Sequence, residues 1–197
     1  MHSLLGVVPL SAFVLLHAYG QWPALDGREA WTDDAVHRGL SGWLLALVLL
    51  AFVAHAVLGV LRLRREPRPQ GDLRGPSGLR ALQAATGIVA FGFVLYHVLS
   101  LGVLGGGPHA GVRAPYARLW NDLGRPRELA IYLIGTAAVC LHLGHGLSRA
   151  AVGWRLARSE RALLLWRIAA GAVGLALFCL FVQVLSHFAI GTALVAR

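Results

Sequence analysis

The chain has 197 residues, of which 57% are apolar and only 14% are charged, and its mean hydropathy is +0.64. This composition excludes an ordinary soluble domain and is typical of a membrane protein. The formal net charge is +9, and all 18 basic residues are arginines. Because the sequence offers no soluble basic face, we expect no nucleic-acid partner.

Five apolar runs are long enough to cross a bilayer as helices, which takes about 20 residues each. They lie near residues 3–20, 39–61, 80–104, 129–148 and 162–192. The first run lacks the basic start and the cleavage site of a signal peptide, so we interpret it as a retained helix. The sequence therefore predicts an all-α membrane protein with five transmembrane helices, forming a single transmembrane domain over residues 1–197.

The loops between these runs differ in charge. Segment 61–80 carries six arginines and segment 149–167 carries five, whereas segment 21–38 has four acids against two arginines. By the positive-inside rule, the two arginine-rich loops face the cytoplasm. Five crossings then place the N-terminus in the cytoplasm and the C-terminus outside. The loop 105–128, with four arginines and two acids, is a mild exception.

Four histidines lie well inside the apolar runs, and they fall into two matched pairs. The motif Phe-Val-Leu-x-His ends at His17 in the first run and at His97 in the third. His55 in the second run and His142 in the fourth both begin His-x-x-x-Gly, and the first arginine follows each of them by seven residues. The first and third runs thus form one set, and the second and fourth runs form another.

Depth in the bilayer separates the two pairs. At helical rise, His55 and His142 lie about 10 Å from the cytoplasmic edge, whereas His17 and His97 lie roughly 22 Å from it. Two histidines can therefore face each other at each level. A b-type haem takes an axial imidazole on each side of its iron and is apolar enough for a helical bundle. We predict two haem b groups, with axial ligands His17 and His97 for one and His55 and His142 for the other.

Other uses of these histidines fit the sequence less well. Zinc requires a third or fourth protein ligand near each pair, and only one thiol, that of Cys140, is close to one of them. A proton relay usually includes intramembrane acids, whereas every acid here lies in a loop. His145, three residues after His142, is the alternative ligand on the fourth run, but the His-x-x-x-Gly spacing favours His142.

Several polar residues lie at the cytoplasmic ends of the runs, where the propionates of the inner haem would reach. Snorkelling arginines are common at such a membrane edge, so ordinary interfacial positions are the alternative for each of them. The candidate propionate contacts are His2, Ser3, Gln83, Arg62, Arg149 and Arg167.

Taken in order, these segments resemble the cytochrome b membrane-anchor subunit of succinate dehydrogenase and fumarate reductase, of the bacterial type with five helices and two haems. The resemblance covers roughly residues 2–154 and rests on the segments MHSLLGVVPLSAFVLLH, FVAHAVLGV, LQAATGIVAFGFVLYH and IYLIGTAAVCLHLGHGLSRAAVGW. It implies that four of the five helices form the dihaem bundle. It also implies that His55 and His142 hold the proximal haem and that His17 and His97 hold the distal haem.

The resemblance implies a function as well. Such a subunit anchors a flavoprotein and an iron–sulfur protein to the cytoplasmic face of the bacterial cytoplasmic (inner) membrane. It passes electrons between the iron–sulfur subunit and a membrane quinone, which we expect to be menaquinone. Succinate chemistry itself belongs to the flavoprotein. In relatives the quinone site lies near the distal haem, and the candidates here are Glu29, Trp31 and Asp33, although a solvated acidic loop that only sets topology is the alternative.

Two further functions remain open at this point. One is the cytochrome b anchor of another respiratory complex, such as a hydrogenase or a formate dehydrogenase, whose motifs fit this order less well. The other is a transporter whose histidines bind substrate. Transporters commonly place polar sites near the bilayer midplane, whereas the histidine pairs here lie at two depths away from it.

Overall fold

The computed structural model describes residues 6–31, 42–65, 77–103 and 113–191. Within these ranges the regular structure is helical throughout and includes no strand, so the predicted all-α class is confirmed. The elements are η1 (Gly6–Leu10), α2 (Ser11–Gln21), η2 (Trp22–Asp26), α4 (Gly42–Arg65), α5 (Ser77–Val98), η3 (Leu99–Val103), α6 (Arg113–Leu123), α7 (Pro126–Gly153) and α8 (Glu160–Ile190).

Four helices among the described residues are long and apolar enough to cross a membrane. They correspond to the second, third, fourth and fifth predicted runs, so these four predictions are confirmed, with ends displaced by a few residues. The spans are Trp43–Arg64, Gly78–Leu101, Pro126–Gly153 and Glu160–Ile190.

The first predicted crossing differs from the other four. Its described part is the five-residue π-helix η1, which contains Pro9, followed by the 11-residue α2. Trp22 then begins a 3-10 helix with Pro23 in its first turn, and the chain turns at Gly27, whose φ is 104°. The α-helical part of this stretch is therefore 11 residues long, within an unbroken helical stretch of mixed type that runs from Gly6 to Asp26. Residues 1–5 lie outside the described ranges, and the fifth crossing stays a prediction.

Local signals set the ends of the two longest helices. Pro126 occupies the first position of α7, where its missing N–H would have no partner in the helix. Ser159 caps α8, because its hydroxyl accepts a hydrogen bond from the Ala162 amide at 3.2 Å. Gly191 ends α8 in the left-handed conformation, with φ at 76°, which glycine adopts without a steric cost.

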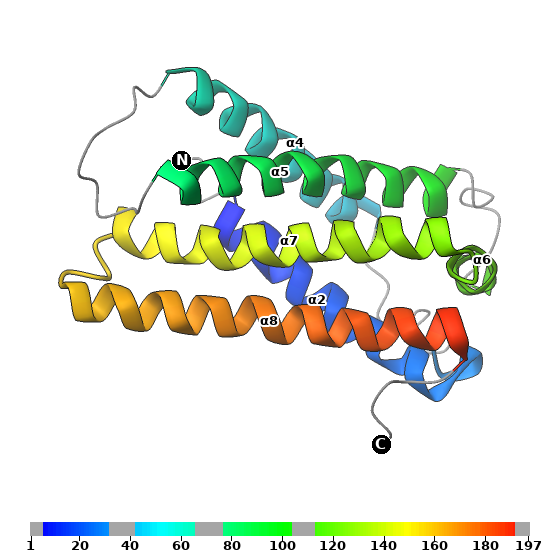
Figure 1. Ribbon diagram of the computed structural model, residues 1–197. Coiled ribbons are helices and arrows are strands. Elements are labelled where there is room, and N and C mark those ends of the chain that lie inside the picture. The colour runs from blue at the N-terminus through cyan, green and yellow to red at the C-terminus, as the bar shows by residue number, and fades with distance from the viewer. Residues whose placement is uncertain (1–5, 32–41, 66–76, 104–112, 192–197) are drawn as a thin grey trace.

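Helices α5, α7 and α8 lie side by side in one layer, and α2 and α4 cross behind it (Figure 1). The closest packing joins α7 to α8. A Cβ atom on Gly174 would lie 2.8 Å from the Cys140 carbonyl oxygen, and one on Gly144 would lie 3.0 Å from that of Ala170. Small residues allow such an approach where lipid surrounds the helices and the hydrophobic effect does not press them together.

The layer has two chemically different ends. At one end, which we call the arginine end, α4 and α7 finish and α5 and α8 begin. The opposite end carries the short helix α6, and we call it the α6 end (Figure 1). No helix was predicted for residues 113–123, because the segment is short and charged and contains Pro115.

Helix α6 is fixed by its apolar side. Tyr116, Leu119 and Leu123 are buried in a cluster with Tyr132 of α7 and Phe188 of α8. The Tyr116 hydroxyl lies 3.0 Å from His187 Nε2. Burial raises the pKa of Tyr116, so this hydroxyl keeps its proton at physiological pH. The cluster therefore closes the bundle at the α6 end.

We predict that Gly174→Ala destabilises the protein, because its new Cβ atom would force α7 and α8 apart. Overpacking of this kind costs about 1–3 kcal/mol. Gly171→Ala is the matched control, because it lies on the same helix and a Cβ atom there would have no neighbour within 4 Å. Thermal unfolding in detergent measures both variants. Equal midpoints for the two would contradict the close packing of α7 on α8.

Candidate functional site

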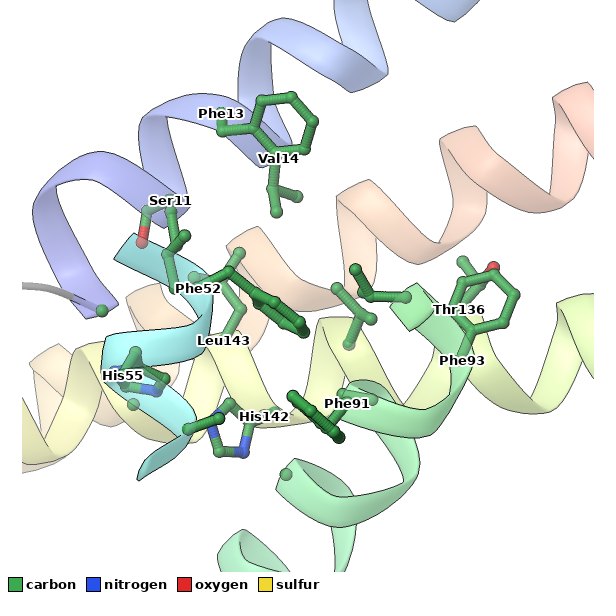
Figure 2. A pocket seen from close by; sticks show the side chains of 18 of the residues that line it. Ser11, Phe13, Val14, Phe52, His55, Phe91, Phe93, Thr136, His142 and Leu143 are labelled. Atoms are coloured by element: carbon green, nitrogen blue, oxygen red, sulfur yellow. The ribbon is translucent and has the colours of Figure 1, made fainter. Parts of the chain in front are cut away.

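A cavity of ≈ 2350 Å³ runs along the inside of the bundle. Typical ligand pockets measure about 300–1,000 Å³, so this cavity exceeds the space that a single small ligand requires. Its walls come from η1 and from all the long helices, and all four histidines of the predicted pairs line it. Figure 2 shows His55 and His142 turned towards each other across this space, among mostly apolar side chains.

The structure brings together His17 of α2 and His97 of α5. Their ring centres lie 5.9 Å apart, and the ring planes make an angle of 80°. Each histidine also contacts the phenylalanine four residues before it: Phe13 stacks on His17 at 5.5 Å, and Phe93 lies 5.9 Å from His97. The repeated Phe-Val-Leu-x-His motif therefore supplies both a histidine and the aromatic ring that supports it.

His55 of α4 and His142 of α7 form a second pair with nearly the same geometry. Their ring centres lie 6.1 Å apart, and the planes make an angle of 82°. Gly6 lies beside His55, where a Cβ atom would come within 2.7 Å of the ring Nδ1. Gly87 lies beside His142 in the same way, and a Cβ atom there would come within 2.8 Å of Cε1. Thus η1 provides a glycine that leaves room for a histidine on α4, and α5 provides one that leaves room for a histidine on α7.

The separation within each pair suits two imidazoles on opposite sides of one metal ion. A metal–imidazole bond is about 2.0 Å long and the ring centre lies about 1 Å behind the nitrogen, so the centres should be about 6 Å apart. Among the described residues, no group of three or more His, Cys, Asp or Glu side chains could hold a metal. The pairs therefore suit a metal whose remaining ligands do not come from side chains of these types.

The contacts of His142 fix its tautomer. The Gln83 backbone carbonyl lies 3.1 Å from His142 Nδ1, and because a carbonyl can only accept, Nδ1 must donate. Nε2 then carries the lone pair, which is the form of the ring that can bind a metal. The Gln83 amide nitrogen donates to the His142 carbonyl at 3.2 Å and lies 3.4 Å from Nε2. The Gln83 Oε1 atom is buried and has no hydrogen-bond partner within the described part of the chain.

His97 has a different partner at the equivalent position. Its Nδ1 lies 3.3 Å from the hydroxyl of Tyr132, a buried residue of α7 that also lines the cavity. When Nδ1 donates to this oxygen, Nε2 keeps the lone pair that a metal requires. Tyr132 was not predicted as a site residue. A tyrosine inside the apolar run LAIYLIG is the one sign of it in the sequence.

The predicted propionate contacts separate into three groups. Arg62, Gln83 and Arg149 line the cavity towards the arginine end, together with two arginines that were not predicted, Arg64 and Arg80. Arg167 is exposed on α8 and does not belong to the described lining. His2 and Ser3 lie outside the described residues.

The predicted quinone candidates also lie in different environments. Trp31 is buried and lines the cavity, and its indole nitrogen donates to Gln21 Oε1 at 3.3 Å. Glu29 is exposed and does not belong to the described lining of the cavity. Asp33 lies outside the described residues. His145, the alternative to His142, does not belong to that lining either.

A comparison with curated proteins identifies one relative of similar length. The chain is 29% identical over 166 residues to the succinate dehydrogenase cytochrome b558 subunit of Bacillus subtilis (strain 168). The match covers 82% of this chain and 81% of that protein. The chain is a homologue of that cytochrome b subunit. No family model matches the chain, and no solved structure matches it significantly.

The homology confirms the resemblance that the histidine motifs indicated. The match covers most of the length of a succinate dehydrogenase cytochrome b subunit. In addition, four described helices of this chain are long and apolar enough to cross a membrane. The chain is therefore an integral membrane protein related to the cytochrome subunits of succinate dehydrogenase.

Proposed function

We propose that the chain is the dihaem cytochrome b membrane anchor of a succinate:quinone oxidoreductase. The observation that carries this proposal is the presence of two histidine pairs in one cavity, with ring centres 5.9 Å and 6.1 Å apart, in a homologue of a succinate dehydrogenase cytochrome b subunit. In this proposal His17 and His97 would hold one haem b, and His55 and His142 would hold the other.

Three features of the site support haem as the group that these residues hold. His142 lines the cavity, and because its Nδ1 donates to the Gln83 carbonyl, Nε2 carries the lone pair that a metal would need. The missing Cβ atoms of Gly6 and Gly87 leave space beside the histidine rings. The buried Gln83 Oε1 has acceptor capacity that no described residue uses. When bound, haem supplies one-electron transfer at a potential set by its ligands and surroundings.

The arginine end is the cytoplasmic end in this proposal. Arg62, Arg64, Arg80 and Arg149 line the cavity there, where they would neutralise haem propionates. The positive-inside rule supports the orientation, with the N-terminus in the cytoplasm and the C-terminus outside. The flavoprotein and iron–sulfur subunits dock at this end, and the membrane is the bacterial cytoplasmic membrane.

The opposite end serves a membrane quinone, which we take to be menaquinone. The cavity reaches the buried Trp31 there, whose indole ring offers a flat apolar surface next to Tyr116. The function of this chain is therefore electron transfer to or from this quinone, whereas the flavoprotein carries out the reaction of succinate.

Substitution of single histidines tests the proposal. We predict that His55→Ala or His142→Ala lowers the haem content of the purified complex from two haems per chain to one. His145→Ala is the matched control, because it lies on the same helix, outside the described cavity lining, and should keep both haems. A pyridine haemochrome assay counts the haems. If His145→Ala lost a haem and His142→Ala kept both, the ligand assignment would be wrong.

Glycine substitution tests the space beside the ligands. Gly87→Ala places a Cβ atom within 2.8 Å of the His142 ring, so the ring must turn away, and we predict loss of the haem held by His55 and His142. Gly92→Ala on the same helix is the control, because nothing lies within 4 Å of its Cβ position. Optical spectra recorded during reduction measure both variants. Full retention of both haems in Gly87→Ala would contradict the predicted fit.

A further inference from the structure

The turn between α7 and α8 must lie at one surface of the membrane. Both helices are long and apolar enough to cross a membrane, and only residues 154–159 join them. Figure 1 shows this turn at the arginine end of the bundle, with α8 at the edge of the layer. The side chains of the turn therefore lie at the level of the lipid headgroups, at the edge of the bundle.

The turn and the start of α8 carry three arginines that have no part in the site described above. Arg155, Arg158 and Arg161 are exposed, and none of them belongs to the described lining of the cavity. Residues 154–161, which we call the arginine turn, contain one acid, Glu160, against these three cations. The arginine turn therefore presents a net positive charge outside the cavity.

The backbone of the arginine turn does not explain why an arginine stands at position 155. The Leu156 amide donates to the Ala151 carbonyl at 2.8 Å, and the Arg155 amide donates to the Val152 carbonyl at 3.1 Å. This Schellman pattern ends α7 with Arg155 in the left-handed conformation, at φ 57°, a position that glycine usually occupies. A side chain there has a steric cost. The arginine is therefore retained at a position where the fold favours glycine.

Arg158 is held against the same turn. Its Nε donates to the Arg155 carbonyl at 3.3 Å, and no described residue engages its two terminal nitrogens. Guanidinium groups bind phosphate oxygens through paired N–H groups, which gives a planar, two-point contact. Two arginines on one ordered turn are therefore suited to a phosphate group.

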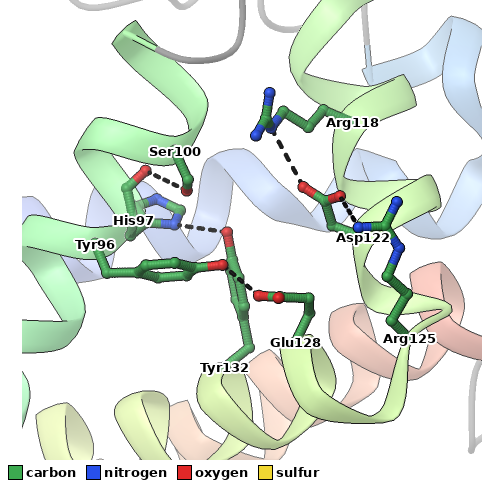
Figure 3. A network of polar contacts seen from close by, with 8 residues as sticks. All are labelled: Tyr96, His97, Ser100, Arg118, Asp122, Arg125, Glu128 and Tyr132. Atoms are coloured by element: carbon green, nitrogen blue, oxygen red, sulfur yellow. Dashed lines mark hydrogen bonds and ion pairs between the residues drawn. The ribbon is translucent and has the colours of Figure 1, made fainter.

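Arginines at the opposite end of the bundle have a different environment. At the α6 end, Asp122 pairs with Arg118 at 3.2 Å and with Arg125 at 3.7 Å (Figure 3). Within the described part of the chain, no acid forms an ion pair with an arginine of the arginine turn. The anion that neutralises the arginine turn is thus expected to come from another molecule.

Apolar side chains next to the arginines indicate which kind of molecule this is. Leu156, Leu164 and Leu165 are 54%, 56% and 60% exposed. Trp154 is exposed as well, at the interfacial level that tryptophan favours in membrane proteins. A phospholipid offers both a phosphate for the arginines and an acyl chain for the leucines, whereas a soluble anion offers the charge alone.

We propose that the arginine turn binds an anionic phospholipid of the leaflet at the arginine end. Arg155 and Arg158 bind the phosphate, Arg161 adds positive charge, and the acyl chain lies along Leu164 and Leu165. This inference goes beyond the proposed function and does not depend on haem or on quinone.

The competing role is a contact with an acidic surface of a partner subunit at the same end. In that case the arginines would bind carboxylates, and their replacement would release the subunit without changing the retention of lipid. A third role, in which Arg155 only completes the turn, predicts that its replacement lowers stability in every lipid. Lipid retention, subunit content and thermal stability together separate the three roles.

The experiment titrates the delipidated complete complex in detergent with phosphatidylglycerol or with phosphatidylcholine, and native mass spectrometry counts the lipids retained. We expect the wild type to prefer phosphatidylglycerol. Arg155→Gly and Arg158→Gln should each weaken its retention about fivefold, since each basic residue near an anionic lipid surface contributes about that factor. Arg125→Gln is the matched control, because Arg125 is exposed at the α6 end and pairs with Asp122, and it should retain lipid as the wild type does.

Thermal unfolding with phosphatidylcholine provides the second readout. Arg155→Gly should keep or raise the wild-type midpoint there, because glycine fits the left-handed conformation. A lower midpoint would assign Arg155 the role of completing the turn and overturn the inference. Equal retention of the two lipids by the wild type, or unchanged retention of phosphatidylglycerol in the Arg155→Gly, Arg158→Gln double variant, would also overturn it. Loss of a partner subunit with unchanged lipid retention would assign the arginine turn to that subunit instead.

Discussion

The imidazole rings lie inside a bundle that faces lipid, so each ring needs a partner for its N–H group and for its lone pair. This need constrains the residues that pack around them. A neutral imidazole has one N–H and one lone pair, and burying either without a partner costs free energy. The Gln83 carbonyl meets Nδ1 of His142, and the Tyr132 hydroxyl meets Nδ1 of His97. The remaining nitrogen of each ring then carries the lone pair, and both rings line the cavity. Glycines beside the second pair, and phenylalanines beside the first, hold the rings in place.

The two ends of the bundle differ in charge and in their proposed roles. The arginine end presents positive charge to the cavity, which suits anionic groups on a cofactor and sets the orientation in the membrane. The α6 end is aromatic and carries the carboxylates Asp122 and Glu128. In the proposed function, electrons from succinate would enter at the arginine end and pass to the quinone at the α6 end. This division gives a physical reason for two histidine pairs at different positions along the helices.

Much of this arrangement could be predicted from the sequence, because the signals are local. Length and apolarity identified four crossings, and the two repeated histidine motifs indicated which rings lie together. The partners of those rings could not be predicted, since Tyr132 and Gln83 meet them across helices whose rotation and register the sequence does not specify. Helix α6 was missed because its stability comes from Tyr116 and Leu123 packing on other helices. The first predicted crossing, residues 3–20, stays a prediction, because residues 1–5 lie outside the described ranges and the described part changes helix type near Pro9 and Pro23.

The most direct test of the central claim is a stepwise redox titration of the wild-type complex, followed by the absorbance of its haem bands. The two pairs have different hydrogen-bond partners at Nδ1 and lie near different charges, so their irons should differ in potential. The account predicts two b-type haems per chain that are reduced in two separate steps. A single haem, or none, would contradict the claim that both histidine pairs are axial ligands.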